Sequence, residues 1–176
     1  MRPDLAEIQR RFIRALNALE KRDSDLLKWD VNERSITHKF AEHLQREFRS
    51  WNVDCEYNRD QGHNKELNLP SRKSTESNDV HATTVFPDII IHHRGTGDNL
   101  VVIEAKKSTN TAVDADEWDF KKLEEFQRWA FNYDVAVFVK FQTGNDPNGQ
   151  PKVTWNPKLD IPAYIPPESR RLEPKG

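Results

Sequence analysis

The sequence predicts an α/β domain with a central mixed β-sheet flanked by helices, in the element order α-α-β-β-β-α-β. Three observations support this prediction. Two amphipathic helical stretches open the chain, two apolar runs rich in β-branched residues are joined by a Gly-containing turn, and a further apolar run follows a third helical stretch. A length of 176 residues suits one domain with appendages.

The first predicted helix covers residues 4–21. Apolar residues recur at helical spacing on one face, and Pro3 precedes the helix, as is common at helix starts. The members of this face are Leu5, Ile8, Phe12, Leu16 and Leu19. We interpret residues 1–30 as an N-terminal accessory segment whose helix packs on the rest of the domain.

The second helix and the first strand follow directly. Residues 32–48 carry apolar side chains at steps of four, namely Ile36, Phe40, Leu44 and Phe48. Residues 53–57 then alternate between apolar and polar, which predicts a half-buried strand. Cys55 lies in this strand, and we interpret it as a small core residue rather than a nucleophile.

Residues 59–82 are polar and show no periodic pattern. A structureless stretch of this length is uncommon in a compact domain unless it is functional or mobile. The sequence therefore predicts a long loop or a partly disordered flap in this region.

The densest apolar runs come next. Residues 85–91 and 100–106 predict two strands of a hairpin, with a turn at residues 94–99. A third helix is predicted over residues 116–132, with Phe120, Leu123, Phe126 and Ala130 on one face. Residues 135–139 form an uninterrupted apolar run, which indicates a strand buried on both faces.

The C-terminal part of the chain, residues 142–176, is rich in Pro, Asn and Gly. Residues 153–155 are compatible with a short edge strand, and the end of the chain predicts an extended tail. The expected organisation is therefore an accessory segment, a core at residues 31–141 and this tail.

Composition excludes some classes of protein. No stretch approaches the roughly 20 consecutive apolar residues of a membrane-spanning helix, so we expect no membrane contact of that kind. The net charge of −2 means that any nucleic-acid contact must be local. The single cysteine excludes a disulfide framework, and the first residues lack the apolar core of a signal peptide, so we expect a cytoplasmic protein.

Two carboxylates and a lysine stand out in the predicted hairpin. Glu104 and Lys106 project to the same side, because positions i and i+2 of a strand share a face. The two hairpin arms have similar length, which brings Asp88 beside them. Two carboxylates suit a hard divalent cation such as Mg²⁺, and an adjacent lysine can position a water molecule, help to deprotonate it, or stabilise developing charge. The alternative is that Glu104 and Lys106 only mark the point where a strand emerges into solvent.

Pro87-Asp88, followed sixteen positions later by Glu104-Ala105-Lys106, resembles the PD-(D/E)XK motif of the restriction-endonuclease-like nucleases. The resemblance covers about residues 32–141 and implies an αβββαβ core. It also implies hydrolysis of phosphodiester bonds in DNA with Mg²⁺ or Mn²⁺. In these terms Asp88, Glu104 and the backbone carbonyl of Ala105 hold the metal, and Lys106 acts on the attacking water.

Many members of this superfamily add a glutamate from the helix before the first strand, and Glu33 is the candidate by resemblance, both for the metal and for catalysis. It shares a helix face with Ile36, Thr37 and Phe40, so we expect it to point toward the sheet. A capping box with Asp30 as the N-cap is the alternative use of Glu33.

Further candidates lie outside the motif. Arg59 leaves the first strand on the side of the expected site, where it either meets a phosphate or merely ends the strand. Lys107 points away from Lys106 and is either structural or a contact to the nucleic-acid backbone. His92 and His93 adjoin the turn and are expected on the surface. Gln127 either faces the site or is a neutral position on the third helix.

The sequence thus favours a magnesium-dependent nuclease acting on DNA, with a homodimer possible because cutting both strands of a duplex commonly requires two active sites. The alternative function is a catalytically inactive, nucleic-acid-binding module that keeps the nuclease fold, or a subunit of a larger complex. A coincidental motif in an unrelated α/β domain would instead leave Asp88 and Glu104 far apart.

Overall fold

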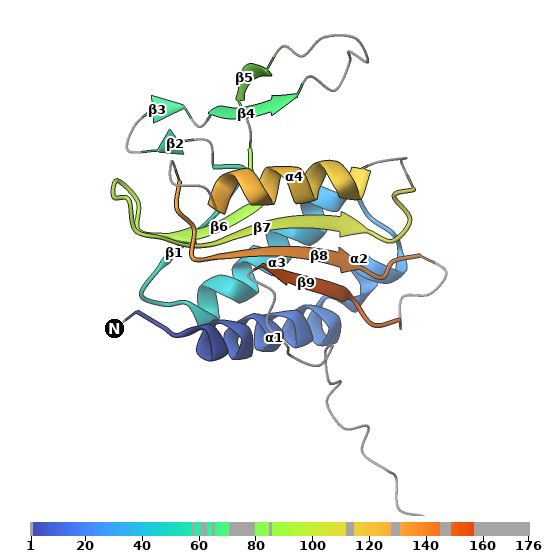
Figure 1. Cartoon of the computed structure of the whole chain (residues 1–176). Coiled ribbons are helices and arrows are strands. Elements are labelled where there is room, and N and C mark those ends of the chain that lie inside the picture. The colour runs from blue at the N-terminus through green and yellow to red at the C-terminus, as the bar shows by residue number, and fades with distance from the viewer. Residues whose placement is uncertain are drawn as a thin grey trace, which may run out of the picture.

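The structure is a computed structural model that describes residues 2–57, 59–60, 63–64, 66–70, 80–84, 86–111, 115–127, 131–144 and 149–156. Its centre is a five-stranded mixed sheet with the strand order β1-β6-β7-β8-β9 (Figure 1). The strands are β1 (Asn52–Cys55), β6 (Ile89–His92), β7 (Asn99–Lys107), β8 (Val135–Phe141) and β9 (Lys152–Asn156). Neighbouring strands are antiparallel except for β7 and β8, which are parallel.

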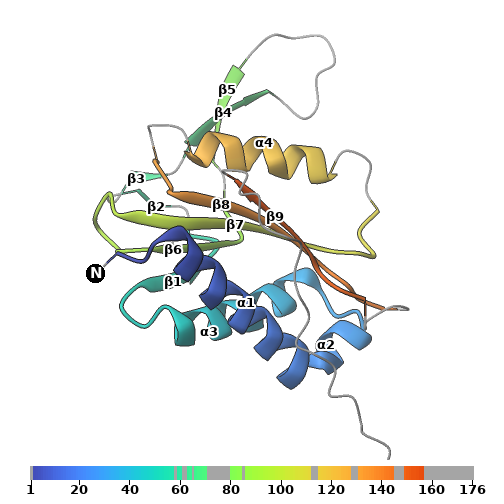
Figure 2. The same cartoon turned by 60° about the horizontal axis from the view of Figure 1, so that its bottom comes forward.

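Helices cover both faces of this sheet. Helices α1 (Leu5–Arg22), α2 (Ser24–Lys28) and α3 (Glu33–Glu47) lie on one face, and α4 (Ala115–Gln127) lies on the other, as the two views show (Figures 1 and 2). Helix α4 connects the parallel strands β7 and β8, as such a crossover requires. No helix among the described residues has both the length and the apolar composition needed to cross a membrane.

Caps and aromatic packing explain why α1 and α3 form and pair. The Asp4 side chain accepts a hydrogen bond from the N–H of Glu7, and the Asn32 side chain accepts one from the N–H of Ser35. Phe12 of α1 packs edge-on against Phe40 of α3, with ring centroids 5.1 Å apart. Both phenylalanines are fully buried, so the apolar stripe of α1 is part of the main core.

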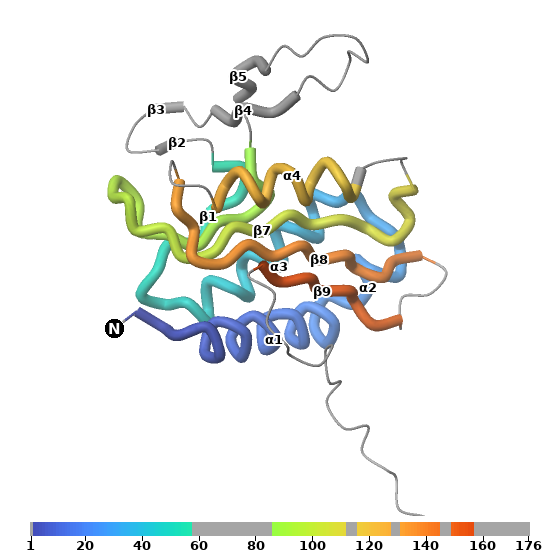
Figure 3. Tube along the Cα trace, viewed as in Figure 1, coloured from blue at the N-terminus to red at the C-terminus, as the bar shows by residue number. Residues whose placement is uncertain are grey.

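The first helix and the last strand of the described chain also lie side by side (Figure 3). The rings of Phe12 and Trp155 are 5.0 Å apart, so β9 closes the sheet edge next to α1. The sheet alternates as expected: Ile89, Ile91 and Ile103 face α1 and α3, whereas Ile90 and Val102 face α4 together with Leu123 and Phe126.

The predicted fold class is confirmed: helices flank a central mixed sheet, and the order from α3 to β8 follows the expected α-β-β-β-α-β core. The hairpin of β6 and β7 and the edge strand β9 are also present. Strand β8 is buried along almost its whole length, as its apolar run predicts.

Other details differ from the predictions. The short helix α2 was not expected, because five residues are too few to show a helical period. The polar region is not wholly a loop: β2 (Arg59–Asp60) pairs with β3 (His63–Asn64), and β4 (Glu66–Pro70) pairs with β5 (Val80–Thr84). Helix α4 ends at Gln127, and residues 128–130 and the tail from residue 157 lie outside the described residues.

Candidate active site

The candidate site begins where β7 extends past the start of β6. Strand β6 starts at Ile89, opposite Ile103, so the next backbone groups on this edge of β7 have no partner from β6. Two side-chain carboxylates accept hydrogen bonds from these backbone groups in place of β6. Asp88 Oδ2 accepts a hydrogen bond from the N–H of Ala105 at 2.7 Å, and Glu33 Oε2 accepts one from the N–H of Lys107 at 3.1 Å.

The backbone carbonyl of Ala105 lies on the same edge. In a strand, the N–H and C=O of one residue point toward the same neighbour. Because the N–H of Ala105 points to Asp88, its carbonyl also faces the side occupied by Asp88 and Glu33. Two carboxylates and a backbone carbonyl therefore lie at this edge of the sheet.

Glu104 projects from β7 toward α4 and is completely buried. Its Oε2 atom lies 2.6 Å from the Nζ atom of Lys122 on α4. Its Oε1 atom has no hydrogen-bond partner in the part of the chain that the structure describes. A buried carboxylate oxygen without a partner carries a large desolvation cost.

Helix α4 supplies a second carboxylate and a second ammonium group. Asp119 contacts both lysines: its Oδ2 lies 2.9 Å from Lys106 Nζ, and its Oδ1 lies 2.9 Å from Lys122 Nζ. Lys106 Nζ also lies 3.7 Å from Oε1 of Glu33. The two lysines are therefore held by acidic groups from α3, β7 and α4.

Burial determines the electrostatics of the two central carboxyl groups. Desolvation raises the pKa of Glu104 well above its ordinary value, and the negative charge of Asp88 raises it further. Desolvation also raises the pKa of Asp88, although the N–H of Ala105 and the charge of Lys122 act in the opposite direction. The two carboxyl groups are thus close enough to influence each other's pKa.

Both lysines stay charged at neutral pH. Burial alone would lower the pKa of Lys106, but the hydrogen bond and charge of Asp119, followed by Glu33, outweigh burial and raise the pKa. The same holds for Lys122, where burial is outweighed by the charges of Glu104 and Asp119 and the pKa is raised. Each side chain is therefore an ammonium group rather than a free amine.

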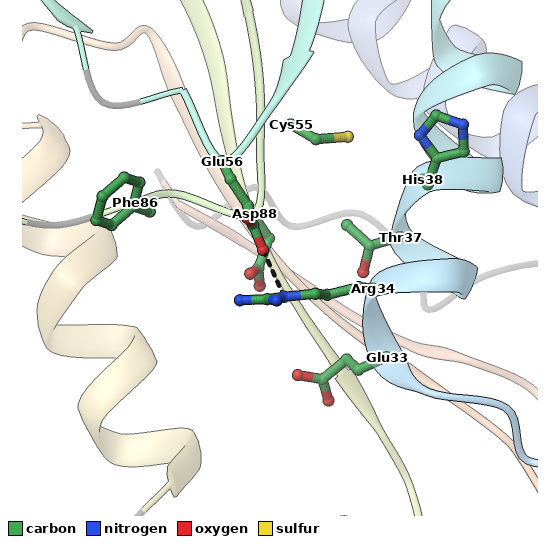
Figure 4. Close-up of a pocket in the computed structure, with 8 residues that line it drawn as sticks. All are labelled: Glu33, Arg34, Thr37, His38, Cys55, Glu56, Phe86 and Asp88. Carbon is green, nitrogen blue, oxygen red and sulfur yellow. Dashed lines mark ion pairs between the residues drawn. The ribbon is translucent and has the colours of Figure 1, made fainter.

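A solvent-open cleft of about 600 Å³ gives access to Asp88. Figure 4 shows Asp88 at its centre, with an ion pair of 2.8 Å between Arg34 and Glu56 at its side. The lining residues are Glu33, Arg34, Thr37, His38, Cys55, Glu56, Phe86 and Asp88. Burial raises the pKa of the Cys55 thiol to about 11, so Cys55 is a thiol and a poor nucleophile, in line with its interpretation as a packing residue.

The hairpin brings the main candidates together as predicted: Asp88 lies beside Glu104 and Ala105, and Lys106 shares the α4 side of β7 with Glu104. Glu33 points toward the sheet, also as predicted. The capping box with Asp30 is wrong, because the N-cap of α3 is Asn32. Asp30 and Asn32 both carry a side-chain oxygen that can cap a helix, and Asn32, which directly precedes α3, is the cap.

The weaker candidates lie elsewhere. The Lys107 ammonium group contacts the backbone carbonyls of Asp30 and Val31 and the Asp30 carboxylate, which favours the structural alternative for Lys107. Gln127 donates a hydrogen bond to the Asn156 carbonyl, away from the site. The side chain of Arg59 lies outside the described residues.

The expectation that both histidines of the turn are surface residues is wrong for His92. His92 is buried, and its Nε2 atom lies 2.8 Å from Asp54. The strand runs one residue further than predicted, so His92 is still covered by the sheet. His93 is partly exposed, stacks on Trp51 and contacts Asp98.

Asp119 and Lys122 were missed at the sequence level. They share the buried stripe of α4 with Leu123 and Phe126, because positions 119, 122, 123 and 126 lie on one face of a helix. Placing Phe120 on the buried face concealed this pattern, and Phe120 is in fact exposed. Two charged residues on a buried helical stripe are the signal that would have identified them.

The described residues contain no group of three or more His, Cys, Asp or Glu side chains arranged to hold a metal ion. The side-chain carboxylates of Asp88, Glu104 and Glu33 lie near the end of β7, together with the backbone carbonyl of Ala105. No family model matches this sequence, and no curated protein or solved structure matches it.

Proposed function

We propose that this chain is a metal-dependent hydrolase of phosphodiester bonds in DNA, with a PD-(D/E)XK nuclease-like centre formed by Asp88, Glu104 and Lys106. One observation carries the proposal. The fully buried Glu104 has an unpartnered oxygen next to a second desolvated carboxylate, Asp88, while a charged lysine stands two residues further along the same strand.

The oxygen donors suit Mg²⁺ or Mn²⁺. Both ions prefer carboxylate and carbonyl oxygens, and Asp88, Glu104 and the Ala105 carbonyl supply these donors, with Glu33 next to them. The raised pKa values of Asp88 and Glu104 mean that the ionised pair is unfavourable without a compensating cation. A divalent ion bound there supplies Lewis acidity and lowers the pKa of a bound water.

In the proposed reaction, one P–O bond of the diester breaks. Water supplies a hydroxyl group to phosphorus and a proton to the leaving oxygen. Lys106 is held as an ammonium group by Asp119, so it stabilises negative charge on the phosphate and orients the water rather than accepting a proton. The proposal therefore gives Lys106 the charge-stabilising and water-positioning roles rather than the role of a base.

The cleft provides a route for the phosphate backbone to Asp88. Arg34 is 85% exposed, and Glu56 is its partner at 2.8 Å. An exposed ion pair of this kind contributes little to stability, so Arg34 can exchange Glu56 for a phosphate group. Arg34 is the one arginine among the described residues that line the cleft, and such a local contact is consistent with a chain whose net charge is −2.

A non-catalytic nucleic-acid-binding module is the second candidate, and one observation favours it. Lys122 already contacts the only side-chain oxygen of Glu104 that has a partner among the described residues, and Asp119 engages both lysines. Because the two lysines already neutralise part of the carboxylate charge, a metal ion would gain less electrostatic stabilisation at this site. In this case DNA binding would be independent of divalent cations.

The experiment is a cleavage assay on end-labelled single-stranded, duplex and branched DNA, with Mg²⁺ and with Mn²⁺. We expect cleavage that EDTA abolishes and that falls by about 100-fold or more in Asp88→Asn and Lys106→Met. Asp134→Asn is the matched control, because Asp134 pairs with Arg2 at the opposite end of β8. This variant should cleave DNA like the wild type. Intact substrates with both metals would contradict the enzymatic proposal.

Binding of the same DNAs in EDTA separates the two candidates. The enzyme requires that Asp88→Asn binds DNA but does not cleave it. Equal DNA affinity in EDTA and in Mg²⁺ for both the wild type and Asp88→Asn, without any cleavage, supports the binding module instead.

A further inference from the structure

Lys122 lies between two buried carboxylates beside the candidate metal site. Its Nζ atom is 2.6 Å from Glu104 Oε2 and 2.9 Å from Asp119 Oδ1. The side chain of Lys122 is 14% exposed, and those of Glu104 and Asp119 are 0% and 3% exposed. Removing one member of such a buried ion pair leaves an uncompensated charge, so Lys122 is a fixed internal cation rather than a mobile surface group.

The charge balance of the cluster is informative. Glu33, Asp88, Glu104 and Asp119 provide four carboxylates, whereas Lys106 and Lys122 provide two ammonium groups. With all groups ionised, the cluster carries an excess of two negative charges. Among the residues that the structure describes, the neighbouring charges are paired with each other and add nothing to this balance: Lys107 with Asp30, Lys140 with Asp116, and Arg34 with Glu56. One divalent cation neutralises the remaining excess.

The number of carboxylate oxygens that remain available to a metal also points to a single ion. Lys122 occupies Oε2 of Glu104, and only Oε1 is without a partner among the described atoms of that carboxylate. Asp119 is engaged by Lys106 through one oxygen and by Lys122 through the other. Nucleases that use two ions hold them about 3.5–4 Å apart by shared carboxylates. Here Oε2 of Glu104 and both carboxylate oxygens of Asp119 already lie within ion-pair distance of ammonium groups.

We propose that Lys122 takes the place of a second metal ion, so that this site binds one divalent cation and Lys122 serves as the positioning residue for Glu104. The inference rests on the proposed function, because it presumes that Asp88 and Glu104 bind a metal. It goes beyond that function by assigning a role to a helix lysine and by setting the number of ions.

The test is the number of Mn²⁺ ions bound per chain, measured by isothermal titration calorimetry and by electron paramagnetic resonance on the intact protein. The wild type is expected to bind one ion. Lys122→Met and Lys122→Gln, which free Glu104 and Asp119, are expected to bind two ions with the spin coupling of a close pair. Lys122→Arg keeps the cation and is expected to bind one.

Lys121→Met is the matched control, because Lys121 lies on the exposed side of α4, where it pairs with Glu117. It is expected to bind one ion, like the wild type. Two ions in the wild type would overturn the inference and leave the metal-dependent function standing. No ion in the wild type would overturn both. Folded Lys122→Met and Lys122→Gln proteins that still bind one ion would overturn the role of Lys122. If neither variant folds, the number of Mn²⁺ ions bound by the wild type still tests the inference.

Discussion

The carboxylate of Asp88 accepts a hydrogen bond from the backbone N–H of Ala105 at 2.7 Å, where a continuous strand β6 would otherwise have supplied a carbonyl. A side chain thus replaces a strand at the end of the sheet. This substitution exposes the Ala105 carbonyl to the same edge and brings Asp88 next to Glu104 without any long-range loop. Sheet geometry, rather than a dedicated loop, assembles the candidate site.

Asp88→Asn should separate stability from activity. The amide oxygen can still accept the hydrogen bond from Ala105, while the variant removes a negative charge that burial makes unfavourable, as the raised pKa of Asp88 indicates. In EDTA at pH 7, we expect a free energy of unfolding by urea that is equal to or higher than that of the wild type. Cleavage and Mn²⁺ binding should both be lost. A large drop in stability would show that Asp88 is mainly structural.

The stability of the metal-free protein should fall as the pH rises above about 4.5. Glu104 has a folded-state pKa raised well above its ordinary value of 4.5. Between these two values the unfolded chain has released this proton and the folded chain has not, so the folded state binds more protons. Stability is then greatest below pH 4.5 for this group and decreases as the pH approaches the folded-state pKa.

Urea unfolding in EDTA at several pH values from 4.5 upward measures this effect, and Glu104→Gln isolates it. The slope of unfolding free energy against pH should be smaller in Glu104→Gln than in the wild type. Glu124→Gln, on the exposed side of α4, should keep the wild-type slope. Identical slopes in the wild type and Glu104→Gln would mean that Glu104 is not protonated in the folded protein.

Glu33→Gln should lower the Mn²⁺ affinity or the cleavage rate while leaving the fold intact. The glutamine can still accept the hydrogen bond from the N–H of Lys107, but it no longer offers a negative charge to Lys106 or to a nearby cation. We expect a loss of about 10–100-fold in Mn²⁺ affinity or cleavage, as for other groups that support metal ligands. Circular dichroism should report an unchanged fold. Wild-type affinity and activity would restrict Glu33 to its backbone hydrogen bond.

Lys107→Met should affect stability rather than DNA binding. The Lys107 ammonium group binds the carbonyls of Asp30 and Val31 and thereby ties the segment before α3 to the end of β7. Its loss should lower the urea midpoint, whereas Lys121→Met on the exposed side of α4 should not. The salt dependence of DNA affinity should be unchanged in folded Lys107→Met. A reduced salt slope with wild-type stability would assign Lys107 to the nucleic-acid backbone instead.

The fold and the motif residues were predictable because strand patterns are local. Alternation and β-branched runs identify β6, β7 and β8, and the i, i+2 rule orients Glu104 and Lys106. The position of Asp88 beside Ala105 follows from the antiparallel hairpin alone. These features need no knowledge of how distant elements pack.

The contribution of α4 could not be assigned so easily. In the sequence, Asp119 and Lys122 look like ordinary solvent-exposed charges, because this helix contains many charged residues. Only the packing of α4 on β7 and β8 covers the pair. The N-cap of α3 and the burial of His92 likewise depend on where an element starts or ends, which local patterns define only to within a residue or two. Only the packing of α3 and α4 on the sheet gathers four carboxylates and two lysines into one partly buried network.

Crystals of the wild-type protein soaked in Mn²⁺ and measured for anomalous scattering provide the most direct test of the central claim. We expect one anomalous peak in contact with the carboxylates of Asp88 and Glu104, on the side of the Ala105 carbonyl. Lys122 should remain bound to Oε2 of Glu104 and to Asp119. The absence of a peak at these carboxylates would contradict a metal-dependent centre in this chain.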